Sequence, residues 1–402
     1  MEGKEIIADL HIHSRFARAC SKAIDIPNLV KYAKIKGIGL LGTADFQHPE
    51  WSKELEVLEE REGLLYFQGF PFIWQTEISL VYSQGGKGRR VHLVILAPSG
   101  EVVKQITEFL GSKGRLDYDG RPIFGFSSIE LVEAMEKISK DIEIIPAHCM
   151  TPWFGVFGSK SGFDSLKECF GEKVEKIHAV ESGMSADPEM LRNFSFLNEK
   201  AVVSFSDSHS FWPWRIGRES TVFTGEFSYN NILKQIRENS FKATVETEPA
   251  YGRYHWDGHR NCDFSCSPEE TRKLKGICPK CGRQLTVGVE YRVEELADQN
   301  SEQFNNKPYY KLLPLHELIA LAKASTLASK KTWQVYNQLI GKFENEFNIL
   351  LHAGKAELAR FLSDERIIDL IILNRQGRIK VKPGYDGEYG QAVLPEKQET
   401  LF

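Results

Sequence analysis

The sequence of 402 residues predicts an α/β protein whose first 250 residues form a barrel. Short apolar segments alternate with segments of helical periodicity, which is typical of parallel strands covered by helices. The strand segments are apolar nearly throughout, as buried strands are. Polar side chains follow almost every strand. Barrels build their sites from the ends of many strands, whereas open sheets use one switch point, so a barrel is favoured.

Six segments are expected to be strands: 5–12, 37–45, 91–98, 141–148, 176–182 and 201–209. Apolar residues recur at helical spacing between them, in 26–37, 51–63, 102–111, 128–140 and 187–200. Periodicity is lost near residue 250. We therefore expect three domains: a barrel (1–250), a four-cysteine zinc module (251–295), and a mainly helical C-terminal domain (296–402) with a short hairpin and a flexible tail.

The composition is that of an ordinary globular protein, with 42% hydrophobic residues and a net charge of −4. This charge argues against a general polyanion binder. No apolar run approaches the ~20 residues that cross a bilayer, and no basic segment followed by an apolar one opens the chain. We expect a cytoplasmic protein, nucleoid-associated if it acts on DNA, with no membrane partner.

Histidines and carboxylates gather at the predicted strand ends. His11 and His13 are two residues apart, so in a strand they point to the same face. Comparable positions hold Asp45, His48, Glu77, His92, His148, Asp207 and His209. One such histidine is usually structural, but this number at one rim indicates a multinuclear metal centre that hydrolyses phosphoesters. His178 is expected to be a hydrogen-bonded core residue, and the role of Glu181 stays open.

Four of the seven cysteines form two close pairs, Cys262-x3-Cys266 and Cys278-x2-Cys281. This pattern predicts a closed tetrahedral site for structural zinc, and a redox alternative lacks a thioredoxin-like context. His255 and His259 lie just upstream; they could serve as spare ligands, but with four cysteines available they are expected in loop or substrate contacts. The other cysteines, Cys20, Cys149 and Cys169, are expected to pack as small core residues.

Basic and aromatic residues are interleaved at three places near the predicted site. They are expected to contact nucleic acid, with cations on phosphates and aromatic rings on bases. An ordinary solvated face is the alternative, and the tryptophans could instead close the barrel mouth. The residues concerned are Lys87, Arg89, Arg90, Trp212, Trp214, Arg215, Tyr254, His255 and Arg260.

Six ordered motifs resemble those of the PHP superfamily of metal-dependent phosphoesterases: ADLHIH, TADFQH, QTE, VHL, PAH and SFSDSH. The resemblance implies a distorted (β/α)7 barrel. It assigns a first ion to His11, His13, Glu77 and Asp207, a second to Glu77, His92 and His148, and a third to His209 with His48 or Asp45. Glu77, Asp207 and His209 would be catalytic. The segment after His13 lacks the further histidine of many members, so the third ligand set stays open.

The order of the whole chain resembles the endonuclease Q family, from the barrel through YHWDGHRNC and CPKCGRQL to PGYDGEYG. The resemblance implies a DNA repair endonuclease that cuts 5′ to uracil, hypoxanthine, xanthine or abasic sites and leaves a 3′-hydroxyl and a 5′-phosphate. It implies divalent Zn, Mg or Mn in the barrel, one structural zinc, and damaged duplex DNA as partner, with single-stranded DNA as a further candidate.

Other functions stay open for this sequence. One is a different PHP phosphoesterase or a DNA exonuclease, and another is a non-catalytic DNA-binding factor. A small-molecule phosphatase needs no zinc module, and a binding factor needs no six ligand motifs. The closing QETLF resembles the start of a sliding-clamp-binding peptide without its aromatic end, so a clamp is a weak candidate partner beside the favoured disordered end.

Overall fold

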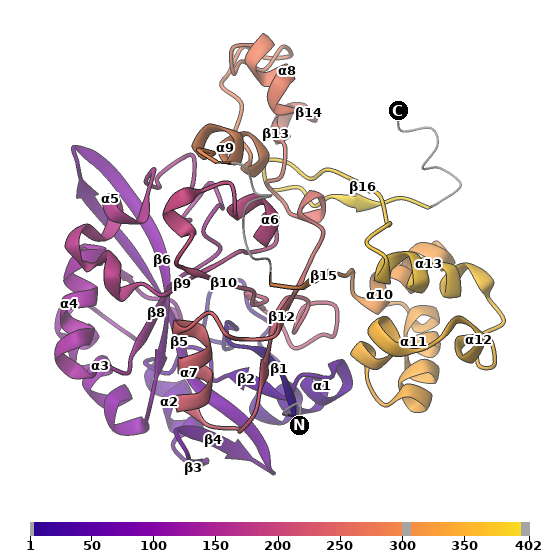
Figure 1. Ribbon diagram of the computed structural model, residues 1–402, viewed down its shortest axis with the longest axis horizontal. Helices are drawn as coiled ribbons and strands as arrows, with labels where there is room; N and C mark the ends of the chain where they lie inside the picture. The colour runs from indigo at the N-terminus through magenta and orange to yellow at the C-terminus, as the bar shows by residue number, and fades with distance from the viewer. Residues whose placement is uncertain (1–3, 300–306, 395–402) are drawn as a thin grey trace.

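A mixed sheet wrapped by helices forms the body of the protein in the computed structural model, which describes residues 4–299 and 307–394 (Figure 1). The predicted α/β class is confirmed. A cysteine-rich projection carries β13 (Asp257–His259), β14 (Phe264–Cys266) and α8 (Pro268–Lys273). The clamp-like QETLF lies outside the described residues. None of the described helices combines the length and apolar character of a membrane span.

The main sheet has 11 strands in the order β15-β12-β11-β1-β2-β5-β4-β3, with β6 and β7 on β5 and β8 on β6. A separate parallel pair is formed by β9 and β10. The bounds are β1 Glu5–Asp9, β2 Leu40–Gly42, β3 Glu59–Arg61, β4 Leu64–Phe67, β5 Phe70–Gln84, β6 Lys87–Ala97, β7 Ile123–Phe124, β8 Glu143–Pro146, β9 Ala179–Glu181, β10 Ala201–Val203, β11 Ser220–Thr224, β12 Ala243–Glu246 and β15 Tyr309–Lys311.

A closed seven-stranded barrel is not confirmed, because the ladder of the main sheet ends at β8 in the described part of the chain. Single backbone hydrogen bonds continue the arc. Cys149 N donates to Glu181 O at 2.9 Å, and His13 N donates to Ser208 O at 3.0 Å.

The prediction of parallel strands is wrong for β6 and β8, which pair antiparallel, β8 with β6 and β6 with β5. The long strand β5 was not among the predicted strands. Glu77 and His92 lie inside β5 and β6 and not at strand ends as predicted, whereas His148 and Asp207 follow β8 and β10.

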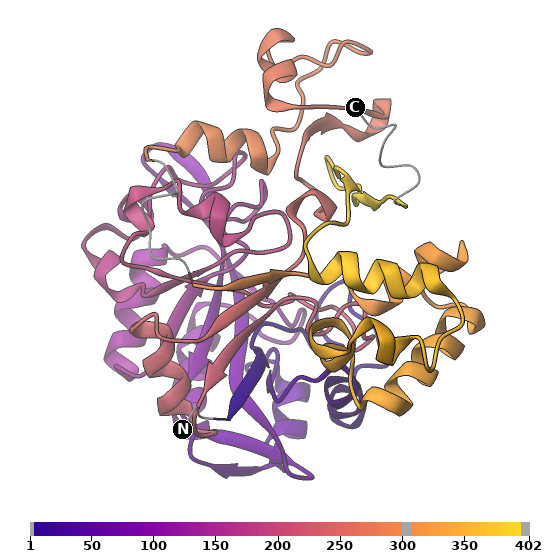
Figure 2. The ribbon, with the colours of Figure 1, turned by 45° about the vertical axis from the view of Figure 1, so that its right-hand side comes forward.

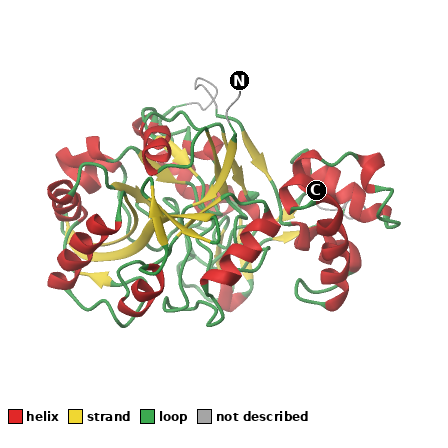
Figure 3. Ribbon diagram, turned by 90° about the horizontal axis from the view of Figure 1, so that it is seen from below, coloured by secondary structure: helices red, strands yellow, loops and turns green. Residues whose placement is uncertain are grey.

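Helices cover the outside of this curved sheet (Figure 3). Asp25, Ser99 and Ser127 begin three of them by accepting an N–H of the first turn. The bounds are α1 Ile26–Lys36, α2 Pro49–Leu55, α3 Gly100–Lys113, α4 Ser128–Ile138, α5 Leu166–Phe170, α6 Pro188–Leu191, α7 Tyr229–Arg237, α9 Val289–Leu296, α10 Leu315–Lys323, α11 Lys330–Phe343, α12 Lys355–Leu358 and α13 Glu365–Arg375.

Two predicted helices are shorter than expected. The helix expected at 51–63 ends at Leu55, since Glu62 and Gly63 have φ of 51° and 71° and form the turn of the β3–β4 hairpin. A side chain at Gly63 would meet Pro98 O at 2.7 Å, so glycine is required there. The helix expected at 187–200 reduces to α6 and a 3-10 turn at Ser195–Leu197.

The predicted domain division stays a prediction. Strand β15, from the third predicted domain, pairs with β12 of the main sheet. The predicted C-terminal hairpin forms from β16 (Val381–Lys382) and β17 (Gln391–Ala392) and lies beside the cysteine-rich segment rather than on the helices (Figure 2). Of the scattered cysteines, Cys149 and Cys169 are buried and Cys20 is half-buried.

The C-terminal helices are fixed to the body by a buried ion pair between Lys36 of α1 and Glu346. Their side chains are 1% and 0% exposed, and Lys36 Nζ lies 2.7 Å from Glu346 Oε1. Glu346 also accepts from Leu315 N and Tyr336 Oη, both at 2.9 Å. Every charge is therefore compensated although water is excluded.

Aromatic rings pack beside this pair. The Trp212 and Trp214 rings stack at 5.4 Å, and Trp214 also contacts His316 and Trp333 of the C-terminal helices. Trp214 is 8% exposed. Trp214 is therefore buried in the interface between body and helices, and the half-buried Trp212 packs beside it. Their DNA contacts stay predictions.

Replacing Lys36 by methionine should lower the free energy of unfolding by about 3–5 kcal/mol, because the Glu346 charge stays buried without its partner. Urea unfolding measures this loss. The matched control is Lys53→Met, which removes an exposed pair with Glu50 and should change the free energy by about 1 kcal/mol or less. Equal losses in the two variants would contradict a stabilising role for the buried pair.

Candidate metal centre

Three segments bring together His11, His13, Glu77 and Asp207: the chain directly after β1, the middle of β5 and the loop after β10. One nitrogen or oxygen of each lies within 4.8 Å of the others. His13 Nε2 is 3.1 Å from both Glu77 Oε2 and Asp207 Oδ1. This is the group that the resemblance implied for a first ion, and the alternation of side chains after β1 accounts for the two histidines pointing the same way.

A second group shares Glu77 and adds His92 and His148. His92 Nδ1 lies 2.9 Å from Glu77 Oε1, and His148 Nε2 lies 3.3 Å from the same oxygen. Glu77 thus faces one group with Oε2 and the other with Oε1. A carboxylate in this position can bridge two cations.

The donor atoms of the first group fit a cation. His11 Nε2, His13 Nε2 and Asp207 Oδ1 are buried and have no hydrogen-bond partner. Buried polar atoms without partners cost free energy, and a divalent ion would satisfy all three. The other ring nitrogens are already used, because His11 Nδ1 lies 2.9 Å from Glu181 and His13 Nδ1 lies 3.1 Å from Asp45. These carboxylates hold each Nε2 lone pair toward the centre.

Glu181 and Asp45 have the same supporting role. Glu181 accepts hydrogen bonds from His148 N at 2.7 Å and from His11, so this carboxylate supports one ligand of each group. Asp45, predicted as a ligand, instead accepts from His13 and from Ser14 N at 2.7 Å. His178, predicted as a core histidine, lies 3.0 Å from Glu143.

The proposed third ion has no comparable group in the described residues. His209 lies beside the first group, with its ring 4.7 Å from that of His13 and its Nδ1 2.9 Å from Asp207 O. The ring of His48 stacks on Phe16 at 4.3 Å. The third ion therefore stays a prediction.

The backbone at two ligands is strained. Asp207 has φ of 47° and His148 has φ of 31°, in the left-handed region that non-glycine residues rarely adopt. Such conformations cost about 1–3 kcal/mol and persist at functional sites where the surroundings impose them. Both residues follow a strand end, where this turn directs the side chain into the centre.

Positive charges surround the shared carboxylate. Burial acts to raise the pKa of Glu77, but His92, Arg121 and His11 outweigh it and hold that pKa well below its ordinary value. Arg121 Nη1 lies 3.0 Å from Glu77 Oε2. Sequence reasoning missed Arg121, because it lies in an irregular segment between α3 and β7 that carries no motif.

A cavity of about 440 Å³ opens over the centre. His92, His148, Asp207 and His209 form its floor, together with Arg121. Trp153 lines it and is 41% exposed. Its other charged and aromatic walls are Arg215, Arg218, Glu219, Arg253, Tyr254 and Tyr389.

The predicted DNA contacts therefore divide. Arg215 and Tyr254 line the cavity, and Lys87 and Arg90 are exposed on the β5–β6 hairpin. Arg89 is 4% exposed and donates to Glu168 and Gly162 O, so its predicted DNA contact is corrected to a structural role. Arg260 and His255 do not line the cavity. Arg260 is exposed beside the C-terminal hairpin, and His255 Nε2 lies 3.7 Å from Glu290.

Two solved structures match almost the whole chain. The lesion-specific endonuclease PfuEndoQ from Pyrococcus furiosus has a TM-score of 0.87 at 28% identity and covers 99% of this chain and 100% of its own. Endonuclease Q in complex with a 27-mer duplex substrate carrying an abasic lesion has a TM-score of 0.89 at 29% identity with the same coverage. Over almost its whole length the chain is similar to these endonuclease Q structures.

Two sequence relatives of the chain are uncharacterized proteins. YqxK of Bacillus subtilis is 27% identical over 413 residues, which cover 96% of this chain and 99% of YqxK. MJ0043 of Methanocaldococcus jannaschii is 34% identical over 260 residues, which cover 63% of this chain but 32% of MJ0043. Residues 314–378 match the family described as the MJ0043 C-terminal domain.

The cysteine-rich projection forms a third candidate metal group. Its members lie within 4.8 Å of one another, but His259 stands where Cys266 was predicted, beside Cys262, Cys278 and Cys281. Cys281 Sγ is 3.3 Å from His259 Nδ1, whereas Cys266 is buried with its Sγ 3.2 Å from Thr271 Oγ1. Three thiolates and one imidazole are an ordinary tetrahedral zinc set.

The hairpin explains this exchange of ligands. Asp257 pairs with Cys266 and His259 pairs with Phe264 across β13 and β14. His259 therefore lies at the turn end of the hairpin, beside Cys262 of the connecting loop, whereas Cys266 lies at the open end. Burial acts to raise the pKa of Cys278, but the backbone N–H groups of Lys280 and Cys281 lower it to about 7. A large fraction of Cys278 is therefore ionised to the thiolate near neutral pH, as metal binding requires.

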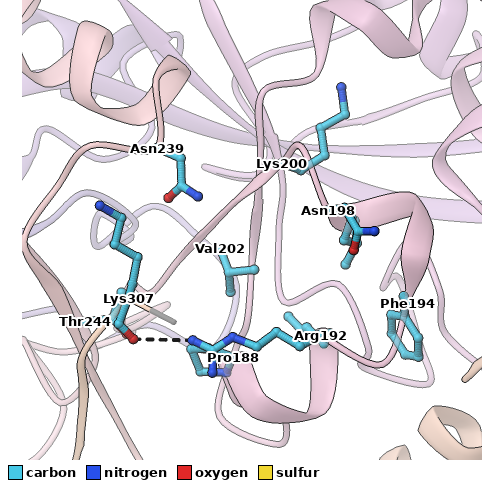
Figure 4. Close-up of a pocket in the computed structure, with 11 residues that line it drawn as sticks. Pro188, Arg192, Phe194, Asn198, Lys200, Val202, Asn239, Thr244 and Lys307 are labelled. Atoms are coloured by element: carbon cyan, nitrogen blue, oxygen red, sulfur yellow. Dashed lines mark hydrogen bonds between the residues drawn. The ribbon is translucent and has the colours of Figure 1, made fainter. Parts of the chain in front are cut away.

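A smaller cavity of about 70 Å³ lies against α6 and β10 (Figure 4). Arg192 crosses it and donates to Lys307 O at 3.3 Å. Pro188, Val202 and Thr244 form other parts of its wall. None of the predicted ligands lines this cavity, so it does not belong to the metal centre.

Replacing His259 by alanine should weaken zinc binding by at least about tenfold, since one of four ligands is lost. Cys266→Ser should retain zinc, because Cys266 contacts Thr271 instead. The metal content of the purified variants and the cobalt–thiolate absorption after cobalt exchange measure this difference. Loss of metal in Cys266→Ser with retention in His259→Ala would restore the four-cysteine set.

Proposed function

We propose that this protein is a metal-dependent DNA repair endonuclease that cuts the phosphodiester 5′ to a damaged base. The observation that carries the proposal is the pair of histidine–carboxylate groups sharing Glu77 at the floor of an arginine-lined cavity. The full-length likeness to a solved endonuclease Q complex with an abasic duplex supports it. Chromosomal DNA as substrate would place the protein in the cytoplasm, at the nucleoid.

The proposed lesions are uracil, hypoxanthine, xanthine and abasic sites, and the proposed products are a 3′-hydroxyl and a 5′-phosphate. A cavity of about 440 Å³ lies in the size range of sites for small molecules, so one extrahelical nucleotide can enter it. Enzymes that read a damaged base take it out of the stack in this way. The half-exposed Trp153 at the cavity offers a face for stacking.

The residues of the chain divide the chemical work. Divalent ions held by the two groups would supply activation of a water and neutralisation of the phosphoryl charge. Glu181 and Asp45 keep His11 and His13 in fixed orientations for this. Arg121, beside Glu77, adds a fixed positive charge near the reacting phosphate.

The donor chemistry limits the ions. Imidazole ligands suit Zn and Mn, and Mg is a further candidate because Glu77 and Asp207 supply oxygens. We propose a separate structural zinc at His259, Cys262, Cys278 and Cys281. This module carries the exposed Arg260 and Lys280, which would contact duplex or single-stranded DNA.

The test uses end-labelled duplexes that carry one uracil, hypoxanthine, xanthine or abasic site, with undamaged duplex alongside. With Mn²⁺ or Mg²⁺ we expect one nick 5′ to the lesion, and none after the metal has been chelated. His11→Ala should lower the nicking rate on the order of 10³-fold, because the first group loses a ligand.

The matched control is His352→Ala, at an exposed histidine of the C-terminal helices, which should nick at the wild-type rate. Circular dichroism of both variants checks the fold. Progressive trimming from the DNA ends would instead identify an exonuclease. Binding of the duplexes without cleavage under any metal would identify a DNA-binding factor.

A further inference from the structure

The C-terminal hairpin brings a distant segment, 383–390 (PGYDGEYG), to the cavity. Gly384 N donates to Ala250 O at 2.8 Å, and Gly390 N donates to Tyr251 O at 3.0 Å. A Cβ at Gly390 would meet Ala250 O at 2.1 Å, so only glycine allows this approach. These contacts fix the position of Tyr389, the residue directly before Gly390.

Tyr389 lies among three arginines. Its ring centroid is 5.2 Å from the guanidinium carbon of Arg215 and 5.1 Å from that of Arg253. Arg218 lies at its hydroxyl; burial acts to raise the pKa of Tyr389, but Arg218 and Arg215 outweigh it and lower that pKa. Together, Arg215, Arg218, Arg253 and Tyr389 are called the arginine cluster below.

No carboxylate within 4.0 Å neutralises the three guanidinium groups, as far as the described residues go. Arg218 Nε and Nη2 donate to Ser206 O at 3.3 and 3.0 Å, and Arg253 Nε donates to Gly387 O at 2.7 Å. Arg218 is 9% exposed, and its Nη1 is buried without a hydrogen-bond acceptor. A buried cation in this state lacks an anion.

Three carboxyl groups of the described residues act on the cluster at longer range: Glu219, Glu317 of α10, and Asp207. Burial raises the pKa of Glu219 and of Glu317, which favours their neutral forms. Asp207 acts on Arg218 but belongs to the first metal group. One such carboxylate does not supply the negative charge that three guanidinium groups would require.

The cluster shares a cavity with the metal centre. All four of its residues line the same walls as Asp207 and His209. The Ser206 carbonyl that holds Arg218 belongs to the residue directly before Asp207. An anion on the cluster would thus lie next to a phosphate on the metal ions, within one substrate.

We propose that the arginine cluster binds the DNA backbone phosphate adjacent to the scissile phosphodiester. Guanidinium groups bind phosphate oxygens through paired N–H donors, which suits a phosphodiester better than a neutral base edge. The Tyr389 ring holds Arg215 and Arg253 apart from each other and in place. This inference rests on the proposed endonuclease function and names a second substrate contact of that site.

The test combines a protein change with a substrate change. Arg215→Gln is compared with wild type on uracil duplexes in which one phosphate at a time, other than the scissile one, is a neutral methylphosphonate. We expect Arg215→Gln to raise KM at least about tenfold with kcat little changed. At one position adjacent to the scissile bond, the methylphosphonate should raise the KM of the wild type at least about tenfold. In Arg215→Gln the same methylphosphonate should raise KM by less than about twofold, because the contact is already lost.

The matched control is Arg366→Gln, an exposed arginine of α13 whose effect should add to that of the methylphosphonate at every position. Additive effects of Arg215→Gln at every position would overturn the proposal. So would a change in preference between uracil and hypoxanthine without coupling to any phosphate, since the cluster would then read the base. Arg253→Gln, which removes another guanidinium group of the cluster and should show the same coupling, serves as the second variant if Arg215→Gln does not fold.

Fluorescence anisotropy with Ca²⁺ in place of the active metal measures the Kd of wild type and Arg215→Gln for the same normal and methylphosphonate duplexes. Coupling in Kd without nicking of any duplex would overturn the proposed endonuclease and leave the phosphate site standing. Nicking of the uracil duplex without coupling in either measurement would overturn the phosphate site alone.

Discussion

The burial of the Glu77 charge is the constraint on which the rest of the site depends. A carboxylate without any exposure is unstable as an anion unless cations or donors surround it. Here the imidazoles of His13, His92 and His148 and the guanidinium of Arg121 do so, and each comes from a different segment. The arc of strands around the centre is the arrangement that lets all of them reach one carboxylate. Glu181 and Asp45 lie behind the imidazoles of His11 and His13, and each carboxylate keeps its imidazole from rotating.

The ligand groups could be predicted because each ligand carries a local mark. His11 and His13 share a face through strand alternation, and His92, His148 and Asp207 each stand at or after a strand that its apolar run reveals. Contacts that depend on how distant segments pair have no local signal in the sequence. The choice of His259 over Cys266 depends on the β13–β14 register, and the burial of Trp214 depends on helices more than 100 residues later. Arg121 and Tyr389 have no recognisable spacing at all.

Strand direction was equally hidden. Strands β5, β6 and β8 are buried on both faces, and a continuous apolar run looks the same in parallel and antiparallel sheets. One local signal was available, since Gly85 and Gly86 both have positive φ between the paired residues Gln84 and Lys87. A Gly-Gly pair between two apolar runs is typical of a tight β-hairpin. That turn fixes β6 antiparallel to β5 and so places His92 beside Glu77.

Tyr389 leaves the ribosome long after the residues of the two groups that share Glu77, because it lies near the end of the sequence. The residues of both groups that share Glu77 lie between positions 11 and 209, so these groups are complete when about half of the chain has been made. Tyr389 follows about 180 residues later, at the elongation rate of about 5–20 residues per second some ten to forty seconds afterwards. A nascent chain can therefore take up its ions well before the arginine cluster is held in place.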